Sequence, residues 1–296
     1  MTPEQLRVFV AVAEMEHMTR AAQTLNMTQS TASAAISALE SRHQVILFDR
    51  IGRGIALTEE GRAFLPEARA VLARLAQAEA MLLETRDLIQ GHIRLIASQT
   101  IAGYWLPAKI AAFRKLYPGI MITLGIGNTQ DATQEVLQGA LDLALVEGEV
   151  SDSQLIKHQV GADRLCLVYA SPCPERFSNV ILEQADWVLR ELGSGTRSSA
   201  DAALANLNFH FPKRESGLVL PSNEAVMSAV EAGAGVTILS ALVVERSLNI
   251  GSLHEYPLPL PPRPFYALRH RDHHISRATQ AFLDLLKSMK IEDVFT

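Results

Sequence analysis

The chain has 296 residues, of which 48% are hydrophobic and 20% charged, and its formal net charge at pH 7 is −5. This composition is that of a folded protein of about two domains, and it excludes a chain that is disordered over most of its length. The negative net charge also excludes a protein that coats nucleic acid through bulk positive charge, so any DNA binding must come from a local site.

The first part of the chain predicts three short helices joined by tight turns. Thr2 and Gln5 form a capping-box pattern at the start of the first helix, and a second helix is predicted over residues 19–25. Thr28 caps a third helix, which has apolar residues on one face and short polar residues on the other. The outward-facing residues near its start are Gln29, Ser30, Thr31 and Ser33. A helix-turn-helix with such a polar start has the dimensions for the DNA major groove, where amide and hydroxyl groups pair with base edges.

Two short extended runs, residues 47–50 and 52–57, follow the third helix and are joined by a turn that contains glycine and arginine. They predict a β-hairpin of the kind known as a wing. We expect Arg50 and Arg53, at its tip, to contact phosphates or a narrow minor groove, in preference to being solvated turn residues. Residues 1–58 are therefore predicted to form a winged helix-turn-helix DNA-binding domain.

A long helix is predicted to run from its N-cap, Thr58, to about residue 90. Apolar or small residues recur in it every seven positions. The repeat consists of Ala68, Leu75, Leu82 and Ile89, with Val71, Ala78 and Thr85 as a companion seam. Such a repeat favours pairing with a second copy, so residues 59–90 are predicted to be a linker and dimerisation helix. The alternative is a single connecting helix packed on its own domain, and Pro66 is expected to kink the helix or to end its first turn.

Residues 91–296 change character, because short β-branched runs alternate there with helical periods, which is typical of a doubly wound α/β sheet. Strands are expected at residues 92–97, 121–126, 141–146, 165–169, 187–190, 236–239 and 265–268. Crossings near Gly161 and Arg263 are predicted to divide this α/β domain into two lobes. The first lobe takes residues 91–161 and 268–296, and the second takes residues 162–267. Ligands bind such sheets at the carboxyl ends of strands and at helix N-termini.

Polar residues follow several of the expected strands at these places, and they form a candidate ligand site, which is the candidate effector site if the protein is a regulator. They are Ser98, Gln99, Thr100, Asn128, Thr129, Glu147, Gly195, Thr196 and Arg197. Hydroxyl groups, helix-end amides and a guanidinium together favour a small anion, although each feature alone is also compatible with ordinary helix capping. Glu147 would repel an anion unless it is paired with Arg197 or protonated, and it favours a ligand that carries a hydrogen-bond donor.

A dense set of residues carries a family resemblance over essentially the whole chain. In the first part they are Leu6, Phe9, Ala21, Ala22, Leu25, 28–33, Ile36, Leu39, Glu40, 47–50, Leu57, Thr58 and Gly61. In the second part they are 106–107, Phe113, 117–118, Gly139, 141–144, 222–226 and 233–235. The sequence closely resembles the LysR-type transcriptional regulators. It departs from them at His43-Gln44, where the family commonly has Leu-Gly, and at Ile46, where it often has Pro, so the third helix is expected to lack a glycine cap.

The resemblance implies a winged helix-turn-helix, a linker helix and a two-lobed α/β effector domain of the periplasmic-binding-protein-like type 2 class. It implies a homo-oligomer, usually a tetramer built as a dimer of dimers, that binds partly palindromic promoter DNA and responds to a small metabolite. RNA polymerase is a further expected partner. In this interpretation Gln29, Ser30, Thr31 and Ser33 read base edges, Thr28 caps the helix, and Arg50 and Arg53 grip the backbone or the minor groove.

The segments 99–107, 146–148 and 187–191 look like the branch of this family that is associated with sulfur assimilation. The effector is therefore predicted to be an anionic sulfur species such as sulfite or sulfate, and the alternative is an organic carboxylate or an amino-acid derivative. A second class of function is a solute-binding α/β protein that does not bind DNA. The wing and the polar-faced third helix within residues 28–58 disfavour that class.

Other chemistries find little support in the sequence. Residues 193–195 lack the spacing of a hydrolase Gly-x-Ser-x-Gly motif, so no catalytic residue and no enzymatic activity are predicted. The histidines of residues 269–274 have irregular spacing, and Cys166 and Cys173 lack metal-ligand spacing, so neither a metal nor a cofactor is expected. No apolar run approaches the ~18 residues of a membrane span, and residues 1–16 are too charged for a signal peptide, so we expect a cytoplasmic protein with no membrane partner.

Overall fold

The computed structural model describes residues 1–51, 54–83, 91–148, 150–170, 185–207 and 217–288. The chain divides into two compact units, one built mainly from Met1–Thr85 and the other from the rest of the chain. Among the described residues, no helix combines the length and the apolar character that crossing a membrane requires.

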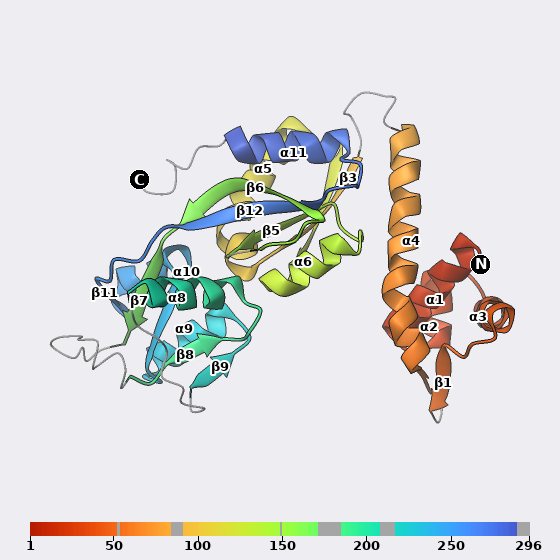
Figure 1. Cartoon of the computed structure of the whole chain (residues 1–296), viewed down its shortest axis with the longest axis horizontal. Helices are drawn as coiled ribbons and strands as arrows, with labels where there is room; N and C mark the ends of the chain where they lie inside the picture. Colours follow the sequence, from red (N-terminus) through yellow and green to blue (C-terminus); the bar gives the residue numbers. More distant parts are fainter. Residues whose placement is uncertain (52–53, 84–90, 149, 171–184, 208–216, 289–296) are drawn as a thin grey trace. The chain divides into compact units, whose positions relative to one another are not determined.

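The first unit contains the three predicted helices, the wing and the start of the long helix (Figure 1). Its helices are α1 (Pro3–Met15), α2 (Met18–Thr24), α3 (Gln29–His43) and α4 (Glu59–Leu83), and its strands are β1 (Phe48–Ile51) and β2 (Gly54–Leu57). The capping box is confirmed, because the Thr2 hydroxyl accepts from the Gln5 N–H at 3.2 Å and the Gln5 side chain accepts from the Thr2 N–H at 2.9 Å. Phe9 and Leu39 are fully buried in the core between the helices.

The end of α3 uses an unusual residue as its cap. Gln44 adopts the left-handed conformation with φ of 54°, the role that glycine commonly fills at this position. The N–H groups of Gln44 and of Val45 both donate to the carbonyl oxygen of Glu40, the second at 3.1 Å. The prediction that α3 lacks a glycine cap is therefore confirmed. The helix nevertheless ends in the usual left-handed conformation, with Gln44 in place of glycine.

Helix α4 packs on its own unit at one position of the predicted seam and exposes other positions of it. Ala68 is fully buried in the core of the first unit, where it packs with the residues of α1. Val71 and Ala78 of the companion seam are exposed, and Leu75 is half-buried. Pro66 lies inside the helix. The side chain of Leu82 and all of residues 84–90, including Thr85 and Ile89, lie outside the described residues.

The second unit begins with a mixed sheet, which forms the first lobe. Its strands, in the order β4-β3-β5-β12-β6, are Ile120–Ile126, Gly91–Ala97, Leu143–Glu147, Arg263–His270 and Leu155–Asp163. Strand β3 runs parallel to β4 and to β5, whereas β12 runs antiparallel to β5 and to β6. Helices α5 (Leu106–Leu116) and α11 (Arg277–Ser288) lie on one face and α6 (Thr129–Leu137) on the other (Figure 1).

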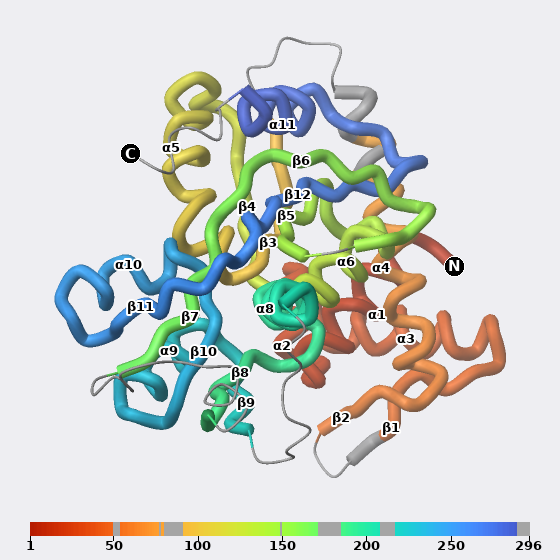
Figure 2. The backbone as a smooth tube through the Cα atoms, turned by 60° about the vertical axis from the view of Figure 1, so that its left-hand side comes forward, coloured from red at the N-terminus to blue at the C-terminus, as the bar shows by residue number. Residues whose placement is uncertain are grey.

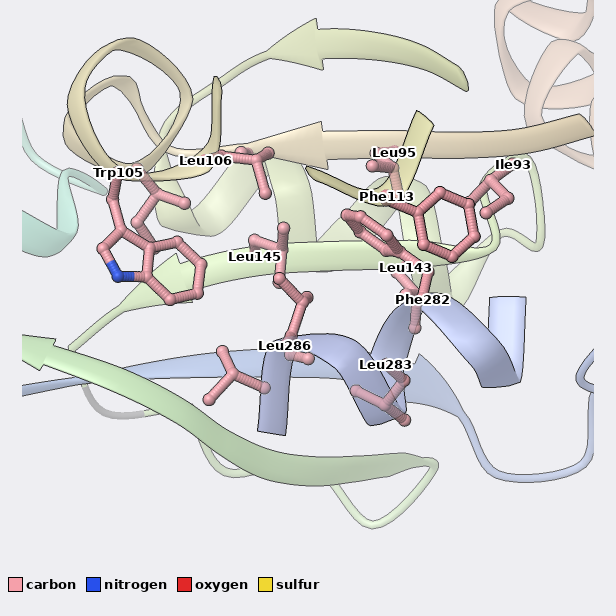
Figure 3. Close-up of a cluster of buried hydrophobic side chains, with 14 of the residues drawn as sticks. Ile93, Leu95, Trp105, Leu106, Phe113, Leu143, Leu145, Phe282, Leu283 and Leu286 are labelled. Carbon is pink, nitrogen blue, oxygen red and sulfur yellow. The ribbon is translucent and has the colours of Figure 1, made fainter. Parts of the chain in front are cut away.

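The core of this lobe lies between the sheet and α5 and α11. Figure 3 shows Phe113 and Phe282 facing each other, and their ring centroids are 5.0 Å apart. Trp105, at the end of the π-helix η1 (Ile101–Trp105), packs edge-on against Phe265 of β12 at 5.4 Å. Gly161 lies under this indole, since a Cβ atom there would be 2.8 Å from Trp105. This packing fixes the strand ends that carry the candidate effector residues.

The second lobe contains two smaller sheets. In the first, β7 (Leu165–Tyr169) lies between β10 (Val236–Ser240) and β11 (His254–Tyr256); in the second, β8 (Val188–Arg190) pairs with β9 (Leu218–Leu220). Its helices are α8 (Gly195–Asn206), α9 (Asn223–Glu231) and α10 (Ala241–Ile250). Cys166 is buried in β7, where burial raises the pKa of its thiol to about 12, so it behaves as a core residue. Cys173 lies outside the described residues.

All seven expected strands are present, β7 with the predicted ends and the other six with shifted ends, but β6, β9 and β11 were not predicted. Strand β6 carries Lys157, His158 and Gln159 at the edge of its sheet, which gives it no apolar run, and β9 and β11 are only 3 residues long each. Strand β6 continues to Asp163, and β12 pairs with it from Arg263 on. The first lobe therefore reaches residue 163 and resumes at 263, and the two crossing segments run beside each other (Figure 2).

Candidate functional site

The first candidate site is the start of α3. Thr28 is its N-cap, and its hydroxyl oxygen accepts from the Thr31 N–H at 3.2 Å. The same oxygen lies 2.9 Å from the Ser30 hydroxyl and 2.8 Å from the Thr31 hydroxyl. The Gln29, Ser30 and Thr31 side chains are exposed and that of Ser33 is half-buried. These four predicted residues thus share the outer side of one helical turn.

The opposite face of α3 explains why this side is exposed. Ala32, Ile36 and Leu39 are buried against α1 and α2, and their spacing of three and four residues places them on one stripe of the helix. Because this stripe is anchored in the core, the polar side chains of the first turn point to solvent. A helix held in this way can present amide and hydroxyl groups to base edges in a major groove.

The wing follows α3 as an antiparallel pair in which Phe48 faces Leu57 and Arg50 faces Ile55. The expected wing is therefore present as a hairpin. The side chain of Arg50, and all of Arg53, lie outside the described residues.

The second candidate site is built around Glu147, at the end of β5. Its carboxylate is 2% exposed. The Ser98 hydroxyl, at the end of β3, donates to one carboxylate oxygen, and the Thr196 hydroxyl, in the first turn of α8, donates to the other at 3.2 Å. The Thr129 hydroxyl donates to the backbone carbonyl of Glu147 at 2.9 Å. Ser98 belongs to the first lobe and Thr196 to the second, so Glu147 joins the two lobes.

Gly195 permits this approach of the lobes. A Cβ atom at position 195 would lie 2.3 Å from the Glu147 carbonyl oxygen and 2.3 Å from the Thr129 hydroxyl oxygen. No larger residue fits there without moving the backbone of one lobe. Glycine at the start of α8 is thus required by close packing rather than by its φ angle.

Arg263 supplies the positive charge at this point, a role that the sequence suggested for Arg197. Its Nη1 atom donates to the Thr196 hydroxyl at 3.0 Å and lies 3.5 Å from Glu147 Oε1. Its Nε donates to Asp163 Oδ1 at 2.8 Å, and its Nη2 donates to the second Asp163 oxygen. Burial alone would lower the pKa of Arg263, but the carboxylates of Asp163 and Glu147 raise it above its usual value.

We call Ser98, Glu147, Asp163, Thr196 and Arg263 the Glu147 cluster. Its two carboxylates and one guanidinium give a formal charge of −1 in a place where each of these three side chains is at most 3% exposed. Asp163 also accepts a hydrogen bond from the Ser240 hydroxyl at 2.6 Å. Buried charge of one sign is unfavourable, so a ligand that brings a hydrogen-bond donor to the cluster would be stabilised there.

Arg197 contacts other groups. Its Nε lies 2.9 and 3.1 Å from the two carboxylate oxygens of Asp201, one helical turn further along α8. Its Nη1 donates to the carbonyl oxygen of Arg190 at 3.3 Å. Asn128 caps α6, because its Oδ1 accepts from the Asp131 N–H at 2.9 Å. Asn128 therefore holds the start of α6, and Arg197 is bound within α8 to Asp201.

Gln99 and Thr100 take part in a separate contact between the lobes, centred on Asn223 at the start of α9. The Asn223 N–H donates to Gln99 Oε1 at 2.9 Å, and its side-chain amide donates to the Thr100 hydroxyl at 3.0 Å. Asn223 Oδ1 accepts from Arg190 Nη1 at 2.5 Å. Sequence reasoning missed Asn223 and Arg190, although a polar residue directly after the helix cap Ser222 was a usable signal.

In the described part of the chain, no three or more His, Cys, Asp or Glu side chains come together as a group that could hold a metal ion. His270 and His273 stack with ring centroids 3.9 Å apart, and the Asp272 N–H donates to His270 Nδ1 at 3.1 Å. The histidine-rich segment is therefore organised by ring stacking and a turn.

A winged helix-turn-helix, a long linker helix and a two-lobed α/β domain together define a DNA-binding transcriptional regulator with an effector domain. Residues 3–62 match the bacterial regulatory helix-turn-helix protein family, lysR family, and residues 86–290 match the LysR substrate binding domain. The chain therefore belongs to the LysR family of transcriptional regulators.

Individual relatives agree with this assignment. The HTH-type transcriptional regulator YeiE of Escherichia coli strain K12 is 38% identical over 288 residues, which is 96% of each chain. The HTH-type transcriptional regulator CysL of Bacillus subtilis strain 168 is 31% identical over 256 residues, covering 84% of this chain and 85% of the relative. The crystal structure of full-length CbnR complexed with its target DNA shares the fold with a TM-score of 0.70 and 20% identity, covering 97% of this chain and 99% of that one.

Proposed function

We propose that this regulator reads DNA with the start of α3 and grips the duplex with the wing. The base-reading residues are Gln29, Ser30, Thr31 and Ser33, Thr28 holds the helix start, and Arg50 and Arg53 contact the backbone or the minor groove. The exposure of one polar helical turn, anchored from behind by Ile36 and Leu39, supports the first part of this assignment. The hairpin that follows α3 supports the second part.

Two copies pair through α4 in this proposal, and two such pairs form a tetramer on partly palindromic promoter DNA, where the protein acts on RNA polymerase. Val71 is an exposed apolar residue on α4, at 47% exposure, and the exposed Ala78 lies two helical turns further along. A second α4 helix would cover both residues, together with the half-buried Leu75.

Effector binding is assigned to the Glu147 cluster. The observation that carries this assignment is the convergence of one hydroxyl from each lobe, Ser98 and Thr196, on a single buried carboxylate beside the guanidinium of Arg263. A small anion placed between these groups accepts hydrogen bonds from both hydroxyls and is attracted by Arg263. These groups now bind the carboxylate of Glu147, so an anion replaces contacts that the protein makes with itself.

The charge of Glu147 selects among anions. A fully ionised anion such as sulfate meets a buried carboxylate at close range and is repelled. Sulfite is partly protonated near neutral pH, so it can donate a hydrogen bond to Glu147 and accept one from Ser98 or Thr196. Sulfite is therefore the proposed effector. An amino-acid derivative is the second candidate, because its ammonium group donates to Glu147 while its carboxylate reaches Arg263.

The proposed output is a change in the angle between the lobes. The Thr196 hydroxyl crosses from the second lobe to Glu147 and Arg263 in the first, so an effector that replaces these bonds has a different affinity for different lobe positions. A ligand can shift an equilibrium only through such a difference in affinity. The rotated lobes then change the arrangement of the DNA-binding units within the oligomer and the bend of the promoter.

The experiment is isothermal titration of the full chain with sulfite, sulfate, thiosulfate and O-acetylserine. Sulfite is expected to bind, and Ser98→Ala and Thr196→Val are each expected to weaken its binding about tenfold, because each removes one hydrogen-bond donor. Arg197→Gln is the matched control and is expected to bind sulfite within about twofold of the unchanged chain. Absence of binding by all four compounds refutes the sulfur effector, and equal affinity for sulfate and sulfite refutes the selective role of Glu147.

A further inference from the structure

We infer that Glu40 is a positioning residue for DNA binding, which fixes the wing relative to the recognition helix α3 through its carboxylate. Glu40 lies in the last turn of α3 and faces the segment that leads into β1. It is not among the residues assigned to DNA contact. The inference rests on the proposed contact between the wing and DNA.

One residue holds both ends of the connection between α3 and the wing. The backbone carbonyl of Glu40 accepts from the Val45 N–H at 3.1 Å, at the start of the connection. Its carboxylate oxygen Oε1 accepts from the Leu47 N–H at 2.8 Å and from the Phe48 N–H at 3.3 Å, where the wing begins. Hydrogen bonds from backbone amides to a charged acceptor are stronger than those to a neutral one. The entry strand of the wing is therefore attached directly to α3.

The exit of the wing is attached to α4 at the same place. The Thr58 N–H donates to the Leu47 carbonyl at 3.0 Å, and the Thr58 hydroxyl donates to the Ile46 carbonyl at 2.8 Å. The same hydroxyl accepts from the Gly61 N–H at 2.9 Å. A Cβ atom at Gly61 would lie 2.2 Å from the Leu47 carbonyl oxygen, so this approach requires glycine. Leu47 is thus held by Glu40 on one side and by the start of α4 on the other.

Hydrophobic packing holds the wing base as well, which makes removal of Glu40 tolerable for folding. Leu47 is 3% exposed in the core, and the Phe48 ring lies 5.5 Å from the Phe9 ring. These contacts keep the segment on the first unit, whereas the two N–H bonds to Glu40 define its direction. Loss of the carboxylate is therefore expected to change where the wing points and to leave the core intact.

The geometry supplies three variants of Glu40 that can be compared. Both amides donate to the same oxygen, so glutamine at position 40 can accept both bonds through its own Oε1, and alanine can accept neither. Glu40→Asp keeps the charge but shortens the side chain by one methylene, which withdraws the oxygen from Leu47. Comparing these three variants separates the hydrogen bonds from the charge.

The test is a double-mutant cycle between Glu40→Ala and Arg50→Ala in the full chain. The probe is a duplex that the unchanged protein selects from a random-sequence library, with a scrambled duplex of the same length as a control. Glu40→Ala is expected to weaken binding of the selected duplex about tenfold and to lower the slope of log affinity against log salt by about one, because a phosphate contact is lost. Glu40→Gln is expected to stay within about twofold of the unchanged protein.

The coupling between the two positions decides the inference. Arg50→Ala is expected to weaken binding about tenfold in the unchanged protein and less than about twofold beside Glu40→Ala, because the wing is already misplaced there. If Arg50→Ala weakens DNA binding equally in both backgrounds, the role of Glu40 is overturned, but the proposed contact between the wing and DNA is not. A wild-type affinity of Glu40→Ala also overturns it, as does a Glu40→Gln variant as weak as Glu40→Ala.

Two further outcomes are informative. If Arg50→Ala has no effect on either duplex, the proposed contact between the wing and DNA is wrong, and the inference falls with it. If circular dichroism shows that Glu40→Ala does not fold, Glu40→Asp takes its place in the cycle, and the same coupling with Arg50→Ala is expected. A Glu40→Asp variant that folds and binds like the unchanged protein overturns the inference.

Discussion

The start of α3 and the Glu147 cluster differ in what their polar side chains already contact. Gln29 and Ser30 of α3 are exposed to solvent. Ser98, Glu147 and Thr196 are each at most 2% exposed and hydrogen-bonded to one another. Under the proposed function, a DNA duplex would therefore displace water from α3, whereas an effector would replace hydrogen bonds inside the protein. The comparison teaches that DNA binding at the first site would form new contacts, whereas effector binding at the second site would replace existing hydrogen bonds.

The largest effect is expected from the buried cation of the second site. Arg263→Gln leaves the carboxylates of Asp163 and Glu147 buried without their guanidinium, and it is expected to lower the free energy of unfolding by about 3–5 kcal/mol. Urea unfolding followed by circular dichroism measures the loss. Arg197→Gln breaks a partly exposed ion pair with Asp201 and is expected to cost less than about 1 kcal/mol. Equal losses for the two variants contradict the special position of Arg263.

A smaller effect, confined to DNA binding, is expected at the exposed site. Gln29→Ala is expected to cost about 1–3 kcal/mol of DNA binding and to relax specificity at one base-pair position. Arg53→Ala is expected to weaken binding to all DNA sequences alike and to reduce the dependence of the binding affinity on salt concentration. Mobility-shift titrations with specific and random duplexes distinguish the two. Wild-type binding by both variants would remove the assignment of this unit to DNA contact.

The end of the recognition helix allows a gain in stability. Gln44 adopts φ of 54°, which is unfavourable for a residue with a side chain and natural for glycine. Gln44→Gly is expected to stabilise the first unit by up to about 1 kcal/mol. Thermal unfolding checks the change, with Ala38→Gly as a control that places glycine at an exposed position inside the helix and is expected to destabilise it. A stability loss in Gln44→Gly would show that the Gln44 side chain makes a favourable contact.

The smallest expected effect concerns pH. Burial lowers the pKa of His158 on β6, and the positive charges of Lys287 and Arg269 lower it further. Because the folded pKa lies below the unfolded value, the stability from neutral His158 is present above about pH 6.5 and is lost as the pH falls through the folded pKa. His158→Gln is expected to lose less stability than the unchanged chain between about pH 7 and pH 5. Identical pH profiles would contradict this.

Local features of the sequence predicted much of the first unit, because capping depends on residues a few positions apart. Thr2 with Gln5, and Thr28 with Thr31, follow rules that need no knowledge of the rest of the fold. The wing was predicted for the same reason. The edge strand β6 was missed because its polar residues at 157–159 interrupt any apolar run.

The second site shows where local reasoning ends. Arg197 was predicted as the cation because it stands in the polar segment that opens a helix after an expected strand, but its side chain contacts Asp201 within the same helix. Arg263 reaches Glu147 from a position 116 residues away, and Asn223 reaches Thr100 from 123 residues away. Such contacts follow from the crossing of β6 and β12 between the lobes. A single sequence contains no local pattern that specifies them.

The burial of Ala68 in the first unit makes the beginning of α4 a rigid part of the DNA-binding head. Because an α-helix turns by about 100° per residue, inserting one residue after Ala68 would rotate everything beyond it by that angle relative to the head. Deleting one residue would rotate that part by the same angle in the opposite direction. An insertion of about seven residues would nearly restore the original direction, because it adds nearly two full turns, so we expect length changes of that size to disturb the protein least.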